Sequence, residues 1–510
     1  MRTLLRSMGL VVAMFASGAG ARQRIATAAE VGVESGRLHG ADLGSTVVFK
    51  GIPFAAPPVG ALRWRPPARP APWPGVRDAT RFGAACPQGP DHKEPWAQVG
   101  AMSEDCLFLN VWRPARAGRY PVMVFIHGGG FTYGAAGVPL YDGAALAARG
   151  VVMVTINYRL GRLGFFAHPA LTREDPAGDL GNYAIMDQVA ALRWVKRNIG
   201  AFGGDPANVT IFGESAGAGS VQLLMGSPVG AGLFHKAISD SGAGGSALFP
   251  IRGGALNAEA LGEAWANSLG LKNATAAQLR AIPLADVVRN GRAFPFIDGK
   301  VVTRSPGEPF YRRAAMRIPL IIGSNSNESS LGGMTQAAAM ALLGGDFARF
   351  QQGYVTTTGK PTAAATIDLA EDAGFVLPSF ALADQHAAAG NKTFVYYVDQ
   401  VPVDQRAGSA GTDHGGELEY VFGNRPVEHR WDAKDAAVSK MMGDYWVRFA
   451  RTGDPNGGAA PRWPAVSALP TAYLAIGGTT QARRLQPIQE EVKAAAMADS
   501  RRKWAATAMP

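Results

Sequence analysis

Hydrophobic residues gather in short runs along the chain, separated by longer stretches with helical spacing. The runs are rich in Val, Ile and Phe and are bounded by Gly, Pro or polar residues, as buried parallel strands are. They occupy 122–126, 151–156, 209–212, 236–239, 320–322 and 394–398. In the segment 183–199, apolar residues recur on one face of a helix. This alternation predicts an α/β fold with a mostly parallel central sheet flanked by helices.

The remaining segments predict what surrounds this sheet. Strands at 47–49 and 107–111 indicate an antiparallel lead-in. Two Ala- and Leu-rich stretches, at about 243–317 and 334–389, are expected to be helical insertions over one end of the sheet. Because the chain has no internal repeat and no low-complexity linker, we expect residues 30–510 to form a single domain.

The first 21 residues have the pattern of a secretory signal peptide. Arg2 and Arg6 precede the apolar run 8–15, and small residues follow up to Ala21. The run is too short for a membrane span, which needs about 20 apolar residues. Cleavage after Ala21, or as late as Ala29, is expected to release the chain into the periplasm or the medium, with no stable membrane insertion.

Composition and charge exclude some classes of function. The 510 residues are 47% hydrophobic and 18% charged, which is ordinary for a globular protein. The formal net charge is +10, but no Lys/Arg run is typical of a nucleic-acid site, so we expect no nucleic-acid partner. The eight histidines are scattered and no metal-ligand cluster is visible. In an exported chain, the only cysteines, Cys86 and Cys106, favour one disulfide; the alternative is two buried free thiols.

The candidate chemistry starts at Ser215, in Gly213-Glu-Ser-Ala-Gly217. This G-x-S-x-G pattern follows an apolar strand and precedes an apparent helix, which is the setting of a nucleophile elbow. Gly213 and Gly217 fit such a turn because no room remains there for β-carbons. At a helix N-terminus, Ser215 lies where backbone N–H groups favour developing negative charge.

A glycine-rich motif, His127-Gly128-Gly129-Gly130-Phe131, directly follows the run 122–126. The N–H groups of Gly129 and Gly130, with that of Ala216, are expected to form an oxyanion hole. A flexible glycine loop without a chemical role is the alternative. His127 is interpreted as a residue that positions this loop.

A serine nucleophile needs a histidine base, and in this kind of fold the order along the chain is Ser, acid, His. We expect the base to be His414, which lies in a Gly-rich loop after the run 394–398. His235 lies just before a strand and His386 lies in an Ala-rich stretch, so both are interpreted as structural.

The acid that orients His414 is expected to be Glu328, which follows the run 320–322. Asp413 is the rival candidate. Its direct adjacency to His414 makes the required side-chain geometry difficult.

Longer motifs resemble the type-B carboxylesterase and cholinesterase family over almost the whole mature sequence. They lie at 49–58, 103–111, 127–131, 157–161, 181–183, 202–206, 212–217 and 449–456. Asn327 and Ser329 flank Glu328 where the family usually has an acidic residue and Gly. The later disulfides of animal members are absent, so the chain is most similar to a bacterial member of the para-nitrobenzyl-esterase kind.

This resemblance implies an α/β-hydrolase that cleaves carboxylic esters without a metal or organic cofactor. The residues that it implies are the triad Ser215, Glu328 and His414, the oxyanion donors Gly129, Gly130 and Ala216, the supporting residues Glu214 and Ser241, and the disulfide Cys86–Cys106. With the signal peptide, it predicts a secreted serine carboxylesterase that forms an acyl-enzyme on Ser215 and takes a small-molecule ester as its partner.

Other functions remain as alternatives. A hydrolase of amides, lactones or thioesters is the closer one, because the same triad serves these bonds. A lipase is disfavoured because no amphipathic lid is obvious, and a non-catalytic binding protein is disfavoured by the complete triad. The aromatic candidates for pocket walls are Phe131, Tyr133, Phe249, Phe294 and Phe296.

Overall fold

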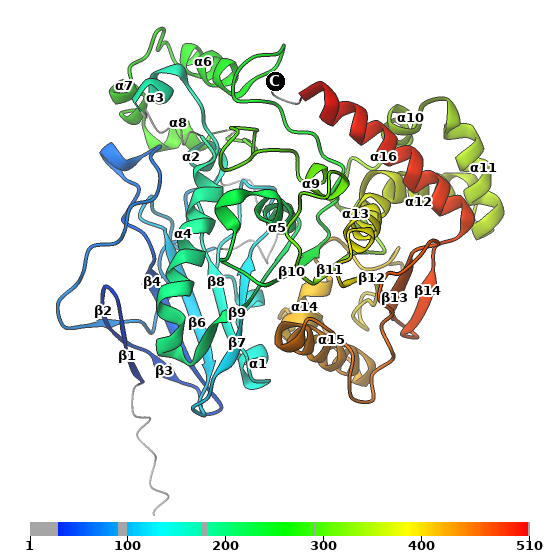
Figure 1. The fold of residues 1–510 in the computed structure, drawn as a ribbon, viewed down its shortest axis with the longest axis horizontal. Helices are drawn as coiled ribbons and strands as arrows, with labels where there is room; N and C mark the ends of the chain where they lie inside the picture. Colours follow the sequence, from blue (N-terminus) through cyan, green and yellow to red (C-terminus); the bar gives the residue numbers. More distant parts are fainter. Residues whose placement is uncertain (1–28, 90–98, 175–180, 290, 508–510) are drawn as a thin grey trace, which may run out of the picture.

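The computed structural model describes residues 29–89, 99–174, 181–289 and 291–507, so the signal peptide expected at 1–21 lies outside the described residues. An eleven-stranded sheet runs through the molecule in the order β14-β13-β12-β11-β10-β9-β7-β8-β6-β4-β3 (Figure 1). Its strands are β3 (Ala41–Asp42), β4 (Thr46–Pro53), β6 (Phe108–Pro114), β7 (Tyr120–Ile126), β8 (Val152–Ile156), β9 (Gly204–Glu214), β10 (Lys236–Asp240), β11 (Leu320–Asn325), β12 (Thr393–Asp399), β13 (Ala472–Gly477) and β14 (Gln481–Arg484).

The pairings from β8 through β7, β9, β10, β11 and β12 to β13 are all parallel. The pairs β3–β4, β4–β6, β6–β8 and β13–β14 are antiparallel. The predicted parallel sheet and its antiparallel lead-in are therefore confirmed. A small second sheet contains β1 (Glu30–Val33), β2 (Gly36–His39) and β5 (Val76–Asp78).

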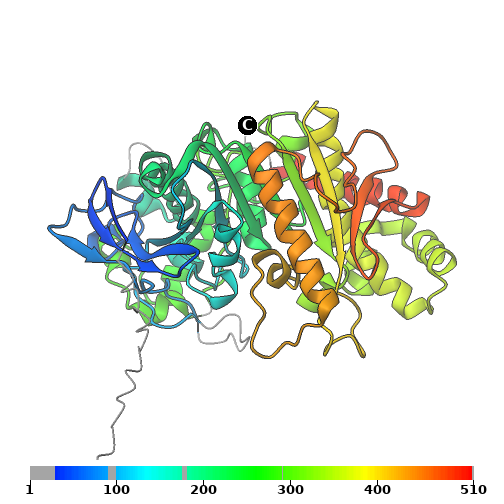
Figure 2. The same ribbon diagram turned by 90° about the horizontal axis from the view of Figure 1, so that it is seen from below.

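Helices cover both faces of the sheet because alternate strand residues point to opposite sides. In β7, Val122, Val124 and Ile126 join one core, whereas Met123 and Phe125 join the other. The first core also takes in residues of α4 (Tyr183–Asn198), α5 (Ala216–Gly226) and α13 (Leu377–Ala388); the second takes in residues of α1 (Ala144–Ala148), α14 (Glu417–Phe422) and α15 (Ala433–Thr452, orange in Figure 2).

The two expected helical stretches differ from each other. The stretch 334–389 is helical almost throughout, with α10 (Gln336–Leu343), α11 (Phe347–Thr358), α12 (Thr362–Glu371), the π-helical turn Asp372–Val376 and α13. In the stretch 243–317, irregular chain joins short helices, so its helical content is lower than the sequence predicts. These helices are α6 (Ala258–Ser268), α7 (Ala276–Arg280), α8 (Leu284–Val288) and α9 (Glu308–Tyr311). Its prolines explain the difference, because each removes a backbone donor and blocks helix continuation.

Three further α-helices complete the described part of the chain. They are α2 (Gly161–Gly164), α3 (Pro169–Glu174) and α16 (Pro487–Thr507), the last of which packs on α13 (red in Figure 1). Among the helices of the described residues, none is long and apolar enough to cross a membrane.

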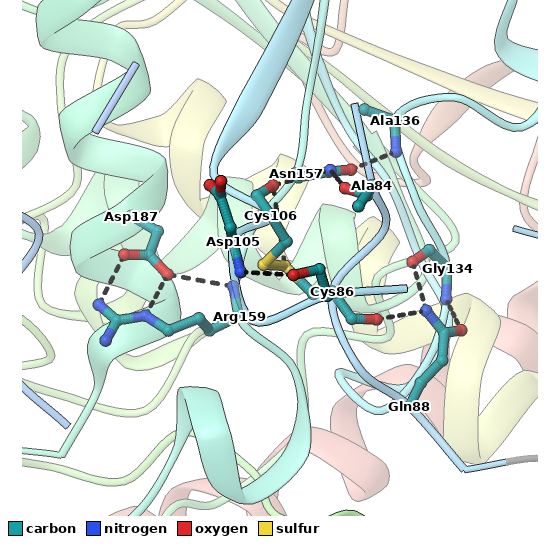
Figure 3. The surroundings of a disulfide bond; sticks show 11 residues. Ala84, Cys86, Gln88, Asp105, Cys106, Gly134, Ala136, Asn157, Arg159 and Asp187 are labelled. Carbon is teal, nitrogen blue, oxygen red and sulfur yellow. Dashed lines mark hydrogen bonds and ion pairs between the residues drawn. A yellow bond between two sulfur atoms is a disulfide. The ribbon is translucent and has the colours of Figure 1, made fainter. Parts of the chain in front are cut away.

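Cys86 and Cys106 form a disulfide, as predicted (Figure 3). The Asn157 side chain donates to the Cys106 carbonyl at 2.9 Å. The Gln88 side chain donates to the Cys86 carbonyl at 3.0 Å and accepts from the N–H of Gly134 at 2.9 Å. These bonds tie the disulfide to the loops that follow β7 and β8.

Candidate active site

Ser215 lies between β9 and α5, at the carboxyl edge of the parallel strands. Its φ of 56° and ψ of −121° lie in a region that non-glycine residues rarely adopt, and such strain is typical of functional sites. Its N–H donates to the Asp240 carbonyl at 2.9 Å, and its carbonyl accepts from the N–H of Gly219 at 2.9 Å. A Cβ on Gly217 would lie 1.9 Å from the Ile126 carbonyl oxygen, so the elbow requires glycine there, as the sequence predicts.

The glycine loop after β7 is held by His127. This ring is buried, stacks on Tyr158 with 4.4 Å between centroids, and donates from Nδ1 to the Gly128 carbonyl at 2.8 Å. The Tyr158 hydroxyl in turn donates to the His127 carbonyl at 2.7 Å. Burial lowers the pKa of His127 to about 4, so the ring is neutral near pH 7.

The predicted oxyanion donors have N–H groups that are free to bind. Gly129 and Gly130 have φ values of +97° and +57°, and no hydrogen bond within the described residues occupies their N–H groups. Ala216 is the first residue of α5, so its N–H has no acceptor within the helix.

Glu328 and His414 come from the loops after β11 and β12. Glu328 is fully buried, and its Oε1 accepts from Ser241 Oγ at 2.7 Å and from the N–H of Asn325 at 2.8 Å. Its Oε2 lies 2.5 Å from His414 Nδ1. Because Nδ1 donates to this carboxylate, Nε2 is left as the acceptor of the imidazole.

The rival acid, Asp413, lies on the exposed side of the same loop. Its Oδ1 accepts from Asn327 Nδ2 at 2.6 Å, and Asn327 and Asp413 also form an isolated parallel bridge. Ser329 donates its N–H to Glu371 Oε1 at 2.6 Å. The two residues in which the chain departs from the family pattern therefore both help to fix the loop that carries Glu328.

Glu214 lies against the other side of the imidazole. Its Oε1 is 3.0 Å from His414 Nε2, but the angles do not suit a hydrogen bond, so the contact is electrostatic. No hydrogen bond between Ser215 Oγ and His414 Nε2 is present in the described part of the chain. The structure thus brings Glu214, Ser241, Glu328 and His414 together beside Ser215, with Nε2 facing Glu214.

Charge governs the protonation of this cluster. Burial lowers the pKa of His414, but the carboxylates of Glu214 and Glu328 outweigh it and raise the pKa to about 9. Burial also raises the pKa of Glu214 to about 7. His414 and Glu214 therefore compete for a proton near neutral pH.

Sequence reasoning missed two buried carboxyl groups in this region. Asp240 accepts from the Tyr396 hydroxyl at 2.7 Å, and burial raises its pKa to about 8. Glu417, at the start of α14, accepts from the Asn325 side chain, and burial raises its pKa well above the usual range. Asp240 adjoins Ser241 and Glu417 shares the motif of His414, but neither position signals burial.

A cavity of about 470 Å³ opens beside Ser215. Among the predicted aromatic residues, Phe131, Phe249 and Phe294 line it, whereas Phe296 is buried and is not one of the lining residues, and neither is Tyr133. No charged side chain of the described residues lines this cavity.

Phe375 also lines the cavity and was not predicted. Its ring meets the His414 ring edge to face, with 5.4 Å between centroids. Phe375 lies in the π-helical turn, and such turns are frequent at functional sites. Within the described residues, no group of three or more His, Cys, Asp or Glu side chains is placed to hold a metal ion.

The sequence matches the carboxylesterase family over residues 27–347 and 347–496. The chain belongs to the carboxylesterase family. This carboxylesterase is 37% identical to the fumonisin B1 esterase of Sphingopyxis macrogoltabida over 457 residues, which cover 84% of this chain and 83% of that protein. It is 35% identical to liver carboxylesterase 1 of Oryctolagus cuniculus over 520 residues, which cover 87% and 90% of the two chains.

Solved structures agree with this assignment. A PNB esterase structure superposes on the chain with a TM-score of 0.77 and 31% sequence identity, covering 92% of this chain and all of that one (100%). The protein therefore has the α/β-hydrolase fold and is a carboxylic ester hydrolase, as the sequence predicts.

Proposed function

We propose that this carboxylesterase cleaves small-molecule esters through an acyl-enzyme on Ser215, with His414 as the base and Glu328 as its orienting acid. The observation that carries the proposal is the 2.5 Å contact between Glu328 and His414 Nδ1, which leaves Nε2 as a proton acceptor beside the strained Ser215. Glu214 is the supporting acidic group, and Ser241 holds Glu328 in place.

The chemistry follows from these roles. Ser215 Oγ attacks the ester carbonyl carbon while its proton passes to His414 Nε2, and the N–H groups of Gly129, Gly130 and Ala216 bind the resulting oxyanion. The protonated imidazole then donates to the alcohol oxygen as the C–O bond breaks, which leaves the acyl group on Oγ. Water, deprotonated by Nε2, hydrolyses this ester and releases the acid.

Glu214 gives this sequence an extra step. His414 Nε2 lies 3.0 Å from Glu214 Oε1, and within the described residues it makes no hydrogen bond with Ser215 Oγ. The imidazole must turn from Glu214 to Ser215 before it accepts the proton, and hydrogen bonds of this kind commonly tighten only when substrate is bound. Glu214 also stabilises the imidazolium that forms during attack, because its carboxylate lies 3.0 Å away.

Export and domain organisation complete the proposal. The N-terminal pattern of a signal peptide and the disulfide both support export to the periplasm or the medium, because disulfides persist in oxidising compartments. Residues 30–510 act as one catalytic domain, since every strand from β3 to β14 except β5 enters the same sheet.

The test is hydrolysis of p-nitrophenyl acetate by the mature wild type and by Ser215→Ala, with Ser268→Ala as the matched control. Ser268 is an exposed serine in α6, outside the cavity. We expect Ser215→Ala to lower kcat by about 10⁴-fold or more. A rapid quench of the wild type should show the acyl mass on the Ser215 peptide.

Two outcomes count against the proposal. If Ser215→Ala retains a tenth or more of the wild-type rate, the nucleophile is wrong. If the wild type turns over the matching anilide or thioester faster than the ester, the natural substrate class is one of these alternatives.

A further inference from the structure

The cavity beside Ser215 follows one face of α5. Ala216, Gly219 and Leu223 line it, and their spacing of three and four residues places them in one row on the helix. Because an α-helix rises 1.5 Å per residue, this row extends about 12 Å from Ser215 to Leu223. Side chains in a helix lean toward its N-terminus. The Leu223 side chain therefore ends the open row about one residue before its own Cα, at about 10 Å from Ser215.

Gly219 leaves the middle of this row open. Of the described residues, a Cβ at this position would meet only Phe131 Cζ, at the ordinary contact distance of 3.7 Å, and the backbone of Gly219 is not left-handed. Gly217, two residues earlier, has no such room. Glycine weakens a helix relative to alanine, so nothing in the local backbone explains Gly219. What it provides is space between α5 and Phe131.

The direction of proton transfer decides whether the acyl part or the alcohol part of the ester enters this space. In the proposed reaction, His414 gives its proton to the alcohol oxygen, so the alcohol lies on the His414 side of the carbonyl carbon. His414 does not line the cavity, whereas Gly130 and Ala216, two of the oxyanion donors, do. With the oxyanion and the alcohol oxygen so placed, the remaining substituent of the carbonyl carbon, the acyl chain, points along α5.

We propose that Gly219 sets the depth of this acyl cavity, and that the enzyme prefers esters of neutral, unbranched acids of about eight carbons. The inference rests on the proposed function of Ser215. An extended chain advances about 1.2 Å per bond, so about 10 Å accommodates about eight chain bonds. Among the residues that the structure describes, no charged side chain lines the cavity, and a charged acyl group there would lose its hydration without a partner.

The experiment compares kcat/KM over p-nitrophenyl esters from acetate to dodecanoate. In the wild type, each added methylene should raise kcat/KM about threefold up to about octanoate, after which the rise stops. Because the leucine side chain leans toward the helix N-terminus, Gly219→Leu fills the row about 4.5 Å from Ser215, so the rise should stop near butyrate. The ratio of kcat/KM for octanoate to that for acetate should then fall about 10²-fold.

Three further variants sharpen the test. Gly200→Leu is the matched control, since Gly200 is exposed in a helical turn and no atom of the described part of the chain lies within 4 Å of an added Cβ there; its ratio should equal that of the wild type. Leu223→Ala lengthens the row and should move the optimum to longer acids. Gly219→Ala adds a single carbon at 3.7 Å from Phe131, so it tests the position even if the leucine variant does not fold, and should lower the ratio about threefold.

The results separate this inference from the proposed function. An unchanged chain-length profile in the folded Gly219 and Leu223 variants overturns the acyl assignment while loss of activity in Ser215→Ala keeps the function intact. A series of alkyl acetates tests whether the acyl or the alcohol part of the ester lies along α5. If Gly219→Leu alters the preference among alcohols rather than among acids, the acyl assignment is also overturned. Activity retained in Ser215→Ala removes the proposed function itself.

Discussion

Replacing Glu328 by Gln tests how the buried carboxylate controls the tautomer of His414. Two donors, Ser241 Oγ at 2.7 Å and the N–H of Asn325 at 2.8 Å, point at Oε1. The backbone N–H cannot become an acceptor, so the glutamine oxygen must take the Oε1 position. The amide NH₂ is then forced toward His414 Nδ1, which has to become an acceptor and pass its proton to Nε2.

The magnitude follows from that tautomer. An imidazole with its proton on Nε2 cannot accept the Ser215 proton, and the corresponding Asp→Asn change in chymotrypsin-like proteases lowers kcat about 10⁴-fold with the geometry intact. This loss corresponds to about 5 kcal/mol in the barrier. The opposite orientation of the amide would keep the proton on Nδ1 but would leave a buried donor facing NH₂, at a cost of about 1–3 kcal/mol; its population would therefore be about 5- to 150-fold lower, so kcat should fall at least about 10-fold even by this route.

The assay is steady-state hydrolysis of p-nitrophenyl acetate, with urea unfolding of each variant to show that the fold is kept. Asp413→Asn is the control, because this exposed residue binds Asn327 instead of the imidazole, and we expect it to retain activity within about threefold. A Glu328→Gln variant that keeps a tenth of the wild-type kcat, or an Asp413→Asn variant that loses 10³-fold, would refute this reasoning.

Two further predictions concern pH and the disulfide. The kcat/KM for p-nitrophenyl acetate should rise with pH as His414 loses its proton, with a midpoint shifted up from 6.5 toward 9. Glu214→Gln should lower that midpoint by about 1 pH unit or more, because one carboxylate that attracts the imidazolium is removed. A midpoint that does not move contradicts the role of Glu214. Since the pKa of His414 is higher in the folded protein, its ion pairs stabilise the fold fully below about pH 6.5 and this stabilisation is lost as the pH rises through about 9. The double variant Cys86→Ser/Cys106→Ser should unfold in urea with a free energy lowered by about 3 kcal/mol, since the bond closes a loop with a sequence separation of 20; equal urea midpoints would show that the disulfide does not restrict the unfolded chain.

The fold was predictable where burial imposes a simple pattern. Strands such as β7 are buried on both faces, so they appear in the sequence as uninterrupted apolar runs. The segment 243–317 was less predictable, since alanine and leucine favour helices locally while prolines divide the segment into short pieces. Composition alone does not show which of these effects prevails.

The candidate site was predictable for a related reason. The loops of Ser215, Glu328 and His414 each follow a parallel strand, and the carboxyl ends of such strands meet at one edge of the sheet. The position of each residue after a strand therefore predicted that the three side chains lie close together. The raised pKa values of Asp240 and Glu417 could not be predicted in this way, because they depend on burial by residues far away in the sequence.

Phe375 shows most clearly what a pattern along the chain does not contain. The segment 362–388 favours helix in its composition, but Pro378 cannot donate a backbone hydrogen bond, and the backbone forms a π-helical turn at Asp372–Val376 just before it. Asp372 accepts from the Tyr354 hydroxyl at 2.5 Å and from the Gln489 side chain at 3.0 Å, so α11 and α16 both hold this turn. The wall of the cavity next to His414 is therefore anchored by the C-terminal helix, and this dependence arises only when segments more than a hundred residues apart pack together.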